Sequence, residues 1–408
     1  MPFFTSLADI EHYLHKQDAK RGTGCYTLER VQQAVVRLDN PQLKYKVIHV
    51  GGTSGKGSTC QMIYSILRSA GYKTGIYTSP HLTGPLERLV INGRSIGETA
   101  FVKLLNSVWE KIKDLQLTYF ELFTVLALYY FAQSQVDYAV IEVGVGGRLD
   151  ATNVVTPKVA VVTDVGLDHT DLLGKTKRAI AKEKEVIIKP GCIGLTGSTY
   201  VKCGRQLNLN EADILKQNLT GTVFNYKTFK NVQLNLVGKY QVRNAILAIT
   251  VAKALHVNKT AIYQGLKQVK SKARFQVVSK QPLIIIDGAH NPQKMRAFTD
   301  SLRQVVKVKD YNQVIVLLAL KYSKDATATL RSLLKFTDVL ILTSFDQGMS
   351  LLTLRQVARQ LNPRLKIILQ KDPILAYQKL QTMLQPKDLG LVTGSLYMIG
   401  KLMKKKLV

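Results

Sequence analysis

The segment from Gly51 to Ser58 combines glycines, hydroxyls and a lysine in a pattern that can bind phosphate. Glycines let consecutive backbone N–H groups converge on phosphate oxygens, and Lys56 adds a positive charge. The general phosphate-loop pattern fails at two positions, because Val50 replaces its first glycine and Gly57 replaces its metal-binding Ser/Thr. A tight turn alone would explain the glycines but not the lysine and hydroxyls. We therefore predict a phosphate-binding loop.

Side chains that could bind a metal follow three predicted strands. Glu142 and Asp168-His169 come after two of these strands, and Ser79 lies in the loop after another. Oxygen ligands with one imidazole suit Mg²⁺ or Mn²⁺ better than a structural zinc. Each residue alone also has an ordinary explanation, as a helix-capping acid, a surface histidine or a turn residue before proline. The residue types therefore allow a metal site without requiring one.

The motif Thr53-x-Gly55-Lys56-Gly57-Ser58 resembles the shortened phosphate loop of the folylpolyglutamate synthases, a branch of the Mur ligase superfamily. The family usually has Thr and Asn where this chain has Gly51 and Ser54. The resemblance implies that ATP is bound by the loop residues Thr53, Ser54, Gly55, Lys56, Gly57 and Ser58.

The same resemblance implies a magnesium site at Ser79, Glu142 and His169. It also implies that CO₂ carbamylates Lys184 and makes it a ligand of a second Mg²⁺. Composition alone would place Lys184 on a solvated helix face, and Glu185-Val186 stands where the family has Ala-Gly. K⁺ or another monovalent cation is a further candidate cofactor.

A second group of motifs lies in the later part of the chain. Asp287-Gly288-Ala289-His290-Asn291-Pro292 matches the family's Asp-x-Ala-His-Asn-Pro signature. Arg274 stands at the family's Pro-Gly-Arg position, although the residues before it are Lys-Ala, and Asn244 matches an asparagine on the adenine side. The resemblance implies ATP contacts from Asn244, Arg274 and Asp287. We expect Lys56, Lys184 and His290 to be catalytic, with His290 stabilising the transferring phosphoryl group.

The family joins L-glutamate to a folate through an acyl phosphate formed with ATP. Its members either extend only tetrahydrofolate tails or also join glutamate to dihydropteroate. Several segments resemble the bifunctional bacterial type, which we favour, and they supply candidate substrate residues at Leu28, Arg30, Phe120, Arg148 and Asp150. Phe120 could stack on a pterin ring, but its apolar helix makes core packing an equal alternative.

Two other classes of function can be set against this hypothesis. A cell-wall Mur ligase would need a uridine-nucleotide domain before the phosphate loop, and about 50 residues precede it here. A nucleic-acid-binding ATPase would need basic and aromatic residues interleaved on one face, whereas the basic residues here are dispersed. A Mur-like ligase for another carboxylate acceptor is a further alternative. The expected partners are small molecules, with neither nucleic acid nor membrane.

The elements that must position these residues alternate between strand and helix. A β-branched run at 47–50 leads into the glycine loop and a helical pattern at 58–70. Further buried strands are expected at 74–77, 138–143 and 159–163, with a helix at 120–133. This order predicts an α/β fold with a doubly wound parallel sheet.

A second strand–helix series begins at Leu283, with strands expected at 283–286, 314–319, 339–343, 366–369 and 390–393. The polar stretch ending at Pro282 separates the two series. We therefore predict an ATP-binding domain at 1–270, a linker at 271–282 and a Rossmann-like domain at 283–408, which is the Mur ligase architecture.

The 408 residues include 57 Lys+Arg and 28 Asp+Glu, a formal net charge of +29. This excess predicts anionic ligands and is spread along the chain, with one dense run at 401–406 that we interpret as a solvated helix end. The four cysteines Cys25, Cys60, Cys192 and Cys203 have no metal or redox spacing and are expected to be free thiols. With neither a signal sequence nor a membrane span evident, we expect a cytoplasmic monomer.

Overall fold

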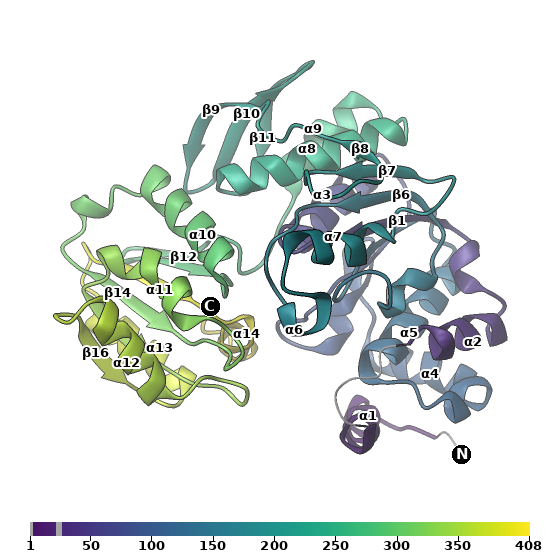
Figure 1. Cartoon of the computed structure of the whole chain (residues 1–408), viewed down its shortest axis with the longest axis horizontal. Coiled ribbons are helices and arrows are strands. Elements are labelled where there is room, and N and C mark those ends of the chain that lie inside the picture. The colour runs from purple at the N-terminus through teal and green to yellow at the C-terminus, as the bar shows by residue number, and fades with distance from the viewer. Residues whose placement is uncertain (1–2, 22–26) are drawn as a thin grey trace. The chain divides into compact units, whose positions relative to one another are not determined.

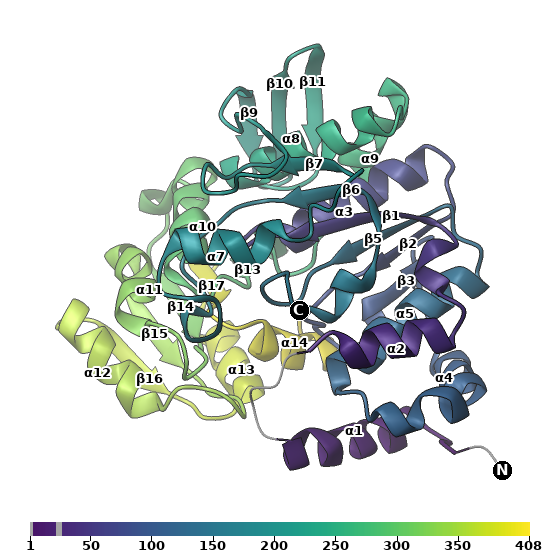
Figure 2. The ribbon, with the colours of Figure 1, turned by 45° about the vertical axis from the view of Figure 1, so that its right-hand side comes forward.

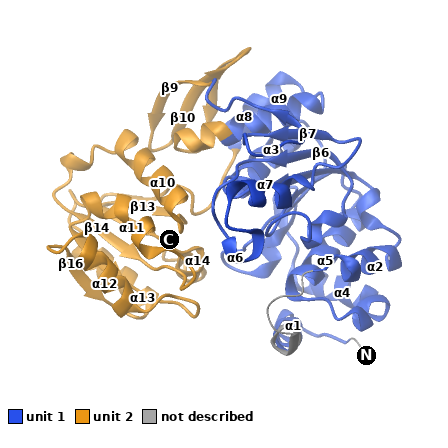
Figure 3. Ribbon diagram, in the orientation of Figure 1, with its two compact units in different colours: residues 1–211, 244–268 blue, residues 212–243, 269–408 orange. Residues whose placement is uncertain are grey.

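The computed structural model describes residues 3–21 and 27–408, which form two compact units (Figure 3). Unit 1 comprises residues 1–211 and 244–268, and unit 2 comprises residues 212–243 and 269–408. The chain therefore passes from one unit to the other three times. Many of the elements of both units are labelled in Figure 1.

The central feature of unit 1 is a sheet whose strand order, among the described residues, is β4-β3-β2-β5-β1-β6-β7-β8 (Figure 2). The strands from β2 to β8 in this order pair in parallel, whereas β3 and β4 are antiparallel additions at one edge. Their bounds are β1 Lys46–Gly51, β2 Thr74–Tyr77, β3 Leu89–Ile91, β4 Arg94–Ser95, β5 Tyr138–Glu142, β6 Pro157–Val162, β7 Ile193–Thr196 and β8 Arg205–Gln206.

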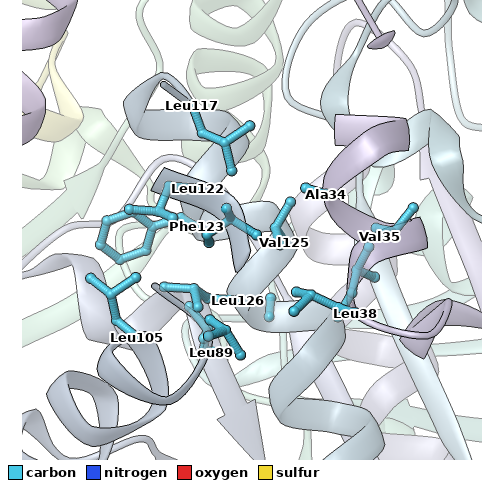
Figure 4. Packing of buried hydrophobic residues seen from close by; sticks show 14 of the residues in the cluster. Ala34, Val35, Leu38, Leu89, Leu105, Leu117, Leu122, Phe123, Val125 and Leu126 are labelled. Atoms are coloured by element: carbon cyan, nitrogen blue, oxygen red, sulfur yellow. The ribbon is translucent and has the colours of Figure 1, made fainter. Parts of the chain in front are cut away.

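Helices pack against this sheet because its parallel strands are apolar on both faces. Ala139 and Ile141 of β5 join a core cluster with α2, α4 and α5, part of which is shown in Figure 4. Helix α3 contacts β1, β2 and β5, and α9 packs on α3. The helices that begin in unit 1 are α1 Leu7–Arg21, α2 Glu29–Arg37, α3 Lys56–Ser69, α4 Glu98–Ile112, α5 Tyr119–Gln133, α6 Thr170–Leu173, α7 Lys177–Glu185 and α9 Lys259–Gln268.

Unit 2 contains two sheets within the described residues. The larger has the order β12-β13-β17-β14-β15-β16, in which only β12 is antiparallel. The smaller is the antiparallel sheet β11-β10-β9. The bounds are β9 Asp213–Asn218, β10 Gly221–Tyr226, β11 Phe229–Leu234, β12 Gln276–Lys280, β13 Leu283–Asp287, β14 Val314–Leu318, β15 Val339–Leu342, β16 Lys366–Leu369 and β17 Leu389–Thr393.

The core of unit 2 forms where helices cover the larger sheet. Met295 and Phe298 of α10 and Leu330 of α11 pack with Ile285 and Val316 of the strands. The remaining helices are α8 Lys239–Ala254, which starts in unit 2 and ends in unit 1, and α10 Pro292–Val305, α11 Ala326–Leu333, α12 Leu351–Leu361, α13 Pro373–Met383 and α14 Leu396–Lys404.

The observed units differ from the predicted domain boundaries in two places. Residues 271–282 are not a linker, because β12 pairs with β13 in the larger sheet and Val277 packs on the core of unit 2. Residues 212–243, predicted to belong to the first domain, belong to unit 2 and carry its smaller sheet. Both segments were hard to recognise because edge strands and small sheets expose half of their side chains and lack long apolar runs.

Other expectations concern the surface and the thiols. Lys401, Lys404, Lys405 and Lys406 are exposed at the end of α14, as predicted for a solvated helix end. Cys60, Cys192 and Cys203 are free, and Cys25 lies outside the described residues. Within residues 3–21 and 27–408, no helix is long and apolar enough to cross a membrane.

Candidate active site

The predicted phosphate loop connects β1 to α3. Gly52 and Gly55 have φ values of +139° and +85°, a region that side chains disfavour, and Gly55 is the N-cap of α3. A Cβ at Gly52 would lie 2.0 Å from Thr163 Oγ1. Lys56 starts the helix, and its Nζ donates to the Gly52 carbonyl at 3.0 Å. The loop therefore needs glycine for both conformation and space, and it presents Lys56 at a helix N-terminus.

Residues after β6 hold the loop in place. Thr53 N donates to Asp164 O at 2.9 Å, and Gly166 N donates to Thr53 Oγ1 at 3.0 Å. Thr163 Oγ1 donates to Ser54 O at 2.6 Å. The contacts of Thr163 and Gly166 with the loop were not predicted from the sequence. Their position after β6 could have predicted these contacts, because β6 pairs in parallel with β1 and neighbouring parallel strands end at the same sheet edge.

Glu142 and Ser79, two of the predicted metal ligands, meet at this edge. Glu142 is the last residue of β5 and is buried, with 4% of its surface exposed. Ser79 N donates to Glu142 Oε2 at 3.2 Å. A Cβ at Gly57 would lie 3.5 Å from the same oxygen, so the phosphate loop approaches this carboxylate closely. A buried carboxylate beside a hydroxyl-bearing residue and a phosphate loop fits a hard cation such as Mg²⁺.

Lys184 lies on α7 and is buried against the phosphate loop. Its Nζ donates to Gly52 O at 3.3 Å, so Lys184 and Lys56 share one acceptor. Burial, reinforced by the charge of Lys56, lowers the pKa of Lys184 to about 7, while Asp168, Asp164 and Asp150 oppose this change. The lysine predicted to lie at the site is therefore inside it and is partly neutral near pH 7.

His169, the fourth predicted ligand, is exposed at the N-cap of α6 with φ of +51°. Its backbone N–H donates to the carboxylate of Asp168, which acts electrostatically on Lys184. Among residues 3–21 and 27–408, no group of three His, Cys, Asp or Glu side chains is arranged to hold a metal. The predicted set contains only two such residues, so its completion depends on Ser79 and on modification of Lys184.

Two candidate substrate residues lie together beside Gly144. Asp150 is buried, and it accepts from Val145 N at 2.9 Å and from Thr152 N and Oγ1 at 3.0 and 2.5 Å. Burial raises the pKa of its carboxyl. A Cβ at Gly144 would lie 2.6 Å from Phe120 Cζ and 3.0 Å from Asp150 Oδ2. Phe120 packs partly into the core beside Tyr77 and keeps an exposed portion, so core packing accounts for part of the ring and stacking on a pterin stays a prediction.

The other candidate substrate residues are tied to neighbouring elements. Arg30 makes a bidentate ion pair with Glu121, the residue after Phe120, at 2.7 and 3.2 Å. Leu28 is the N-cap of α2. Arg148 pairs through Nε with Glu183 Oε1 at 3.0 Å and is exposed. Arg148 therefore lies next to the Lys184 helix and is engaged in an ion pair.

Arg88 is a buried cation that the sequence analysis missed. Its guanidinium lies over the rings of Tyr119 and Phe123, 5.3 and 5.8 Å from their centroids, and Nε donates to His81 Nδ1 at 3.0 Å. His81 belongs to the loop that carries Ser79. About thirty residues separate Arg88 from α5 in the sequence, so its packing on the rings of α5 could not be predicted. The Ser79-Pro80-His81 motif was the one sequence feature near its contact with His81.

Asn244 of α8 lies against the phosphate loop within unit 1. A Cβ on Gly55 would come 2.4 Å from Asn244 Oδ1, so this side chain reaches the helix N-terminus where phosphates are expected. The structure therefore places Asn244 beside the phosphate loop, and its predicted contact on the adenine side stays a prediction.

Arg274, Asp287 and His290 form a second group in unit 2. Asp287 is buried and accepts from Phe275 N and Ala289 N, both at 2.8 Å, while burial raises its pKa to about 6. A Cβ at Gly288 would lie 2.7 Å from Arg274 Nη1, so glycine allows the arginine to cross this turn.

Contacts to both ring nitrogens define the state of His290. Nδ1 lies 2.8 Å from Gly288 O, and because a carbonyl only accepts, Nδ1 carries the proton. Nε2 then accepts from Lys294 Nζ at 3.0 Å. Burial, followed by the charge of Lys294, lowers the pKa of His290. The imidazole is neutral and orients a lysine that the sequence analysis did not include.

The chain matches two domain families of the Mur ligases. Residues 50–191 match the Mur ligase middle domain and residues 273–396 match the Mur ligase glutamate ligase domain. Dihydrofolate synthase/folylpolyglutamate synthase of Escherichia coli is 36% identical over 350 residues, which cover 83% of this chain and 80% of that protein. The chain belongs to the folylpolyglutamate synthase/dihydrofolate synthase family of Mur ligases, as the sequence motifs indicated.

Solved structures agree with this assignment and with the predicted α/β fold. The E. coli FolC complex with DHPP and ADP has a TM-score of 0.87 and 30% identity, covering 98% of both chains. The bifunctional folylpolyglutamate synthase/dihydrofolate synthase of Yersinia pestis complexed with AMPPNP and Mn ion has a TM-score of 0.84 and 30% identity, covering 99% of this chain and 98% of that one.

Proposed function

We propose that this chain is an ATP-dependent ligase that adds L-glutamate to folates, both extending tetrahydrofolate tails and converting dihydropteroate to dihydrofolate. The observation that carries the proposal is the site at the sheet edge of unit 1. There Lys56 and Lys184 both donate to the Gly52 carbonyl of a phosphate loop that lies against buried Glu142. The bifunctional relatives from E. coli and Y. pestis support the same activity.

The nucleotide would be held mainly by the phosphate loop. The free backbone N–H groups at the start of α3, the Lys56 ammonium and the helix dipole all favour the phosphates of ATP. Thr53 fixes the loop through Asp164 and Gly166, and Asn244 lies beside Gly55. We include Ser54, Gly57 and Ser58 in this set. The ATP contacts of Arg274 and Asp287 and the catalytic role of His290 stay predictions for unit 2.

The reaction joins a carboxylate to an amine in two steps. An oxygen of the folate carboxylate attacks the γ-phosphorus, and the P–O bond to the β-phosphate breaks. ADP departs, and the folate now carries an acyl phosphate. The amino group of glutamate attacks the acyl carbon, the C–O bond breaks, and phosphate leaves as the amide forms and the nitrogen loses a proton. Lys56 neutralises charge on the transferring group, so positioning and electrostatics supply most of the rate.

Divalent cations fit the site through Ser79, Glu142, His169 and a modified Lys184. When bound, they would neutralise charge on the phosphate oxygens. Lys184 can be modified because its neutral amine attacks CO₂, forms an N–C bond and releases a proton, which yields a carbamate. We propose two Mg²⁺ ions, and a monovalent cation such as K⁺ stays a prediction.

The pteridine end of the folate would lie near Phe120 and Asp150, which meet at Gly144. The Asp150 carboxyl can bond a pterin edge only if it exchanges one of its present backbone contacts or uses a remaining lone pair. Arg30 orients the start of α5 through Glu121, and Leu28 and Arg148 complete the proposed set. The chain would act as a monomer in the cytosol.

Glutamate-dependent ADP formation tests this function directly. The assay uses dihydropteroate and tetrahydrofolate as separate acceptors, with mass spectrometry of the folate product. We expect both acceptors to gain glutamate. Turnover with tetrahydrofolate alone would support the monofunctional alternative, and turnover with neither would refute the proposal. Lys56→Ala should lower turnover by about 10²-fold or more, the usual cost of removing a group that stabilises transition-state charge.

A further inference from the structure

A positively charged groove runs between α10 and the segment from α11 to the following helical turn, η6 Leu334–Phe336. It has a volume of about 200 Å³. Its charged lining consists of Arg296, Asp300, Arg303, Arg331 and Lys335. Four basic groups and one carboxylate give this groove a formal charge of +3. None of these residues belongs to the site described above.

The charges of the groove are not balanced within the fold. Asp300, the single lining carboxylate, pairs with Arg303 at 3.2 Å, and the Arg303 guanidinium also lies over the ring of Phe336. Among the described residues, no ion pair joins Arg296, Arg331 or Lys335 to an acid. All three are exposed at the surface of unit 2. Exposed cations grouped in a groove without acidic partners favour an anionic ligand.

One end of the groove lies close to the His290 group along the chain. Pro292 lines the groove, is the first residue of α10 and follows His290 by two positions. Lys324, which acts electrostatically on His290, lies just before α11. From Pro292 to Arg303 the helix rises by about 16 Å at about 1.5 Å per residue. The groove is therefore an elongated basic path that starts next to a candidate active-site group.

We propose that this groove binds the carboxylates of the γ-linked glutamyl tail of a folate that already carries several glutamates. This inference rests on the proposed function and names a subsite for its longer substrates. Each glutamate added contributes one more α-carboxylate, so the tail is an elongated polyanion. Arginine and lysine at intervals along α10 and α11 match such repeated carboxylates in charge and in extent.

The test compares acceptors of different tail length. The variant Arg296→Gln/Arg331→Gln/Lys335→Gln removes the three cations that lack acidic partners. We expect its KM for tetrahydrofolate with three glutamates to rise about tenfold, since several modest ion contacts are lost together. Its KM for the monoglutamate and its kcat should stay within about twofold. The parent protein's KM for the triglutamate should rise with NaCl concentration, and the variant's should not.

A matched control removes the same charge elsewhere in unit 2. Lys404→Gln/Lys405→Gln/Lys406→Gln alters exposed lysines at the end of α14 and should leave both KM values unchanged. Equal changes for both acceptors in the groove variant, no change for either, or the same shift in the control would overturn the proposal.

A binding measurement separates this inference from the proposed function. Tri-γ-glutamate alone should bind the full-length parent protein and lose affinity about tenfold in the groove variant, whether or not the chain turns over folates. Inorganic phosphate is the second probe. If the groove variant loses affinity for phosphate by the same factor as for tri-γ-glutamate, the groove is a general anion site and the tail proposal is wrong.

Discussion

Among single residues, Lys184 is the one whose environment departs furthest from that of an ordinary lysine. It is buried on α7, shares the Gly52 carbonyl with Lys56 and has a pKa lowered to about 7 by burial and by that neighbouring charge. A solvated helix face, the interpretation from composition, would have left it protonated. The structure thus provides an amine that is partly neutral near pH 7 at the position where the family resemblance implies a carbamate.

The pH dependence of carbamylation follows from this pKa. Below pH 7 most Lys184 amines carry a proton and cannot attack CO₂, and above pH 7 most are free. After CO₂ is removed and restored at equal dissolved concentration, activity should therefore return about tenfold faster at pH 8 than at pH 6. Recovery of ADP formation over time measures this. Lys184→Arg, which keeps a cation but cannot be modified, should show no recovery, and a recovery rate independent of pH would contradict the account.

A chain of buried hydrogen bonds links β1 to the candidate substrate site. Thr152 Oγ1 donates to Asp150 Oδ1 at 2.5 Å, so it accepts from His49 Nε2 at 2.8 Å. His49 is fully buried, and burial lowers its pKa to about 3. Within the described part of the chain its Nδ1 has no hydrogen-bond partner. Neutral His49 and Thr152 therefore hold the carboxyl of Asp150 and, through it, the turn at Val145.

Thr152→Val should weaken this chain without changing side-chain shape greatly. It leaves the His49 Nε2–H buried without an acceptor and removes a donor from Asp150, at a cost of about 1–3 kcal/mol in the free energy of unfolding. Urea denaturation measures the loss. Thr156→Val, at an exposed position four residues later, is the control and should stay within about 0.5 kcal/mol. Equal effects of the two variants would show that the hydrogen bonds contribute little.

At the scale of elements, the phosphate loop depends on the strand beside it as much as on its own glycines. Thr163 and the residues after it bond three parts of the loop, and the side chain of Thr163 occupies the space where a Cβ on Gly52 would point. The loop conformation is thus set by β1 and β6 together.

Gly52→Ala should therefore abolish ATP binding rather than merely strain the backbone. The added Cβ would lie 2.0 Å from Thr163 Oγ1, so the loop must move. Gly71→Ala is a matched control, because Gly71 also has a positive φ of +88° but no atom within 4 Å of the added Cβ. We expect the control to cost about 1 kcal/mol of stability and to bind ATP normally in calorimetric titration. Similar ATP affinities for both variants would contradict this view of the loop.

Buried parallel strands were the elements best predicted from the sequence. The structure places the largely buried, apolar strands β1, β2, β5, β6, β13, β14, β15 and β17 within a residue or two of the expected bounds. The more exposed edge strand β16 also falls on its expected bounds. The strands β3, β4, β7, β8 and β12 and the small sheet β9–β11 were missed. Four of the six residues of β9 are polar and none is buried, so neither a hydrophobic run nor strict alternation marked this strand.

The candidate site was predictable where its residues stand directly after strands or within motifs. Glu142, Ser79 and the glycine loop could be placed at one edge because parallel strands end together. Arg88, Thr163 and Lys294 could not, since their importance comes from contacts with residues distant in sequence or from a neighbour's protonation state. By residue type alone, Arg88 and Lys294 would be surface cations and Thr163 an ordinary residue at the end of a strand.

At the scale of the whole molecule, the net charge of +29 exceeds what the candidate site can use. Lys56, Arg274 and the groove residues account for a few charges that could meet ATP and a glutamyl tail. The rest must repel one another in the folded chain, and this repulsion opposes compaction.

Screening should therefore stabilise the protein. Raising NaCl from 0.05 to 0.5 M should raise Tm in differential scanning calorimetry, because salt weakens repulsion between exposed like charges. KCl at the same ionic strength should give the same rise, which separates screening from binding of a particular monovalent cation. A Tm that falls with both salts would show that favourable ion pairs outweigh the repulsion.

The central claim is that ATP activates a folate carboxylate for attack by glutamate, and oxygen transfer tests it most directly. The acceptor is tetrahydrofolate whose γ-carboxylate carries ¹⁸O, and mass spectrometry of the released inorganic phosphate follows the label. The account predicts that one labelled oxygen appears in phosphate for each amide formed. Unlabelled phosphate released in step with amide formation would show that no acyl phosphate forms and would contradict the central claim.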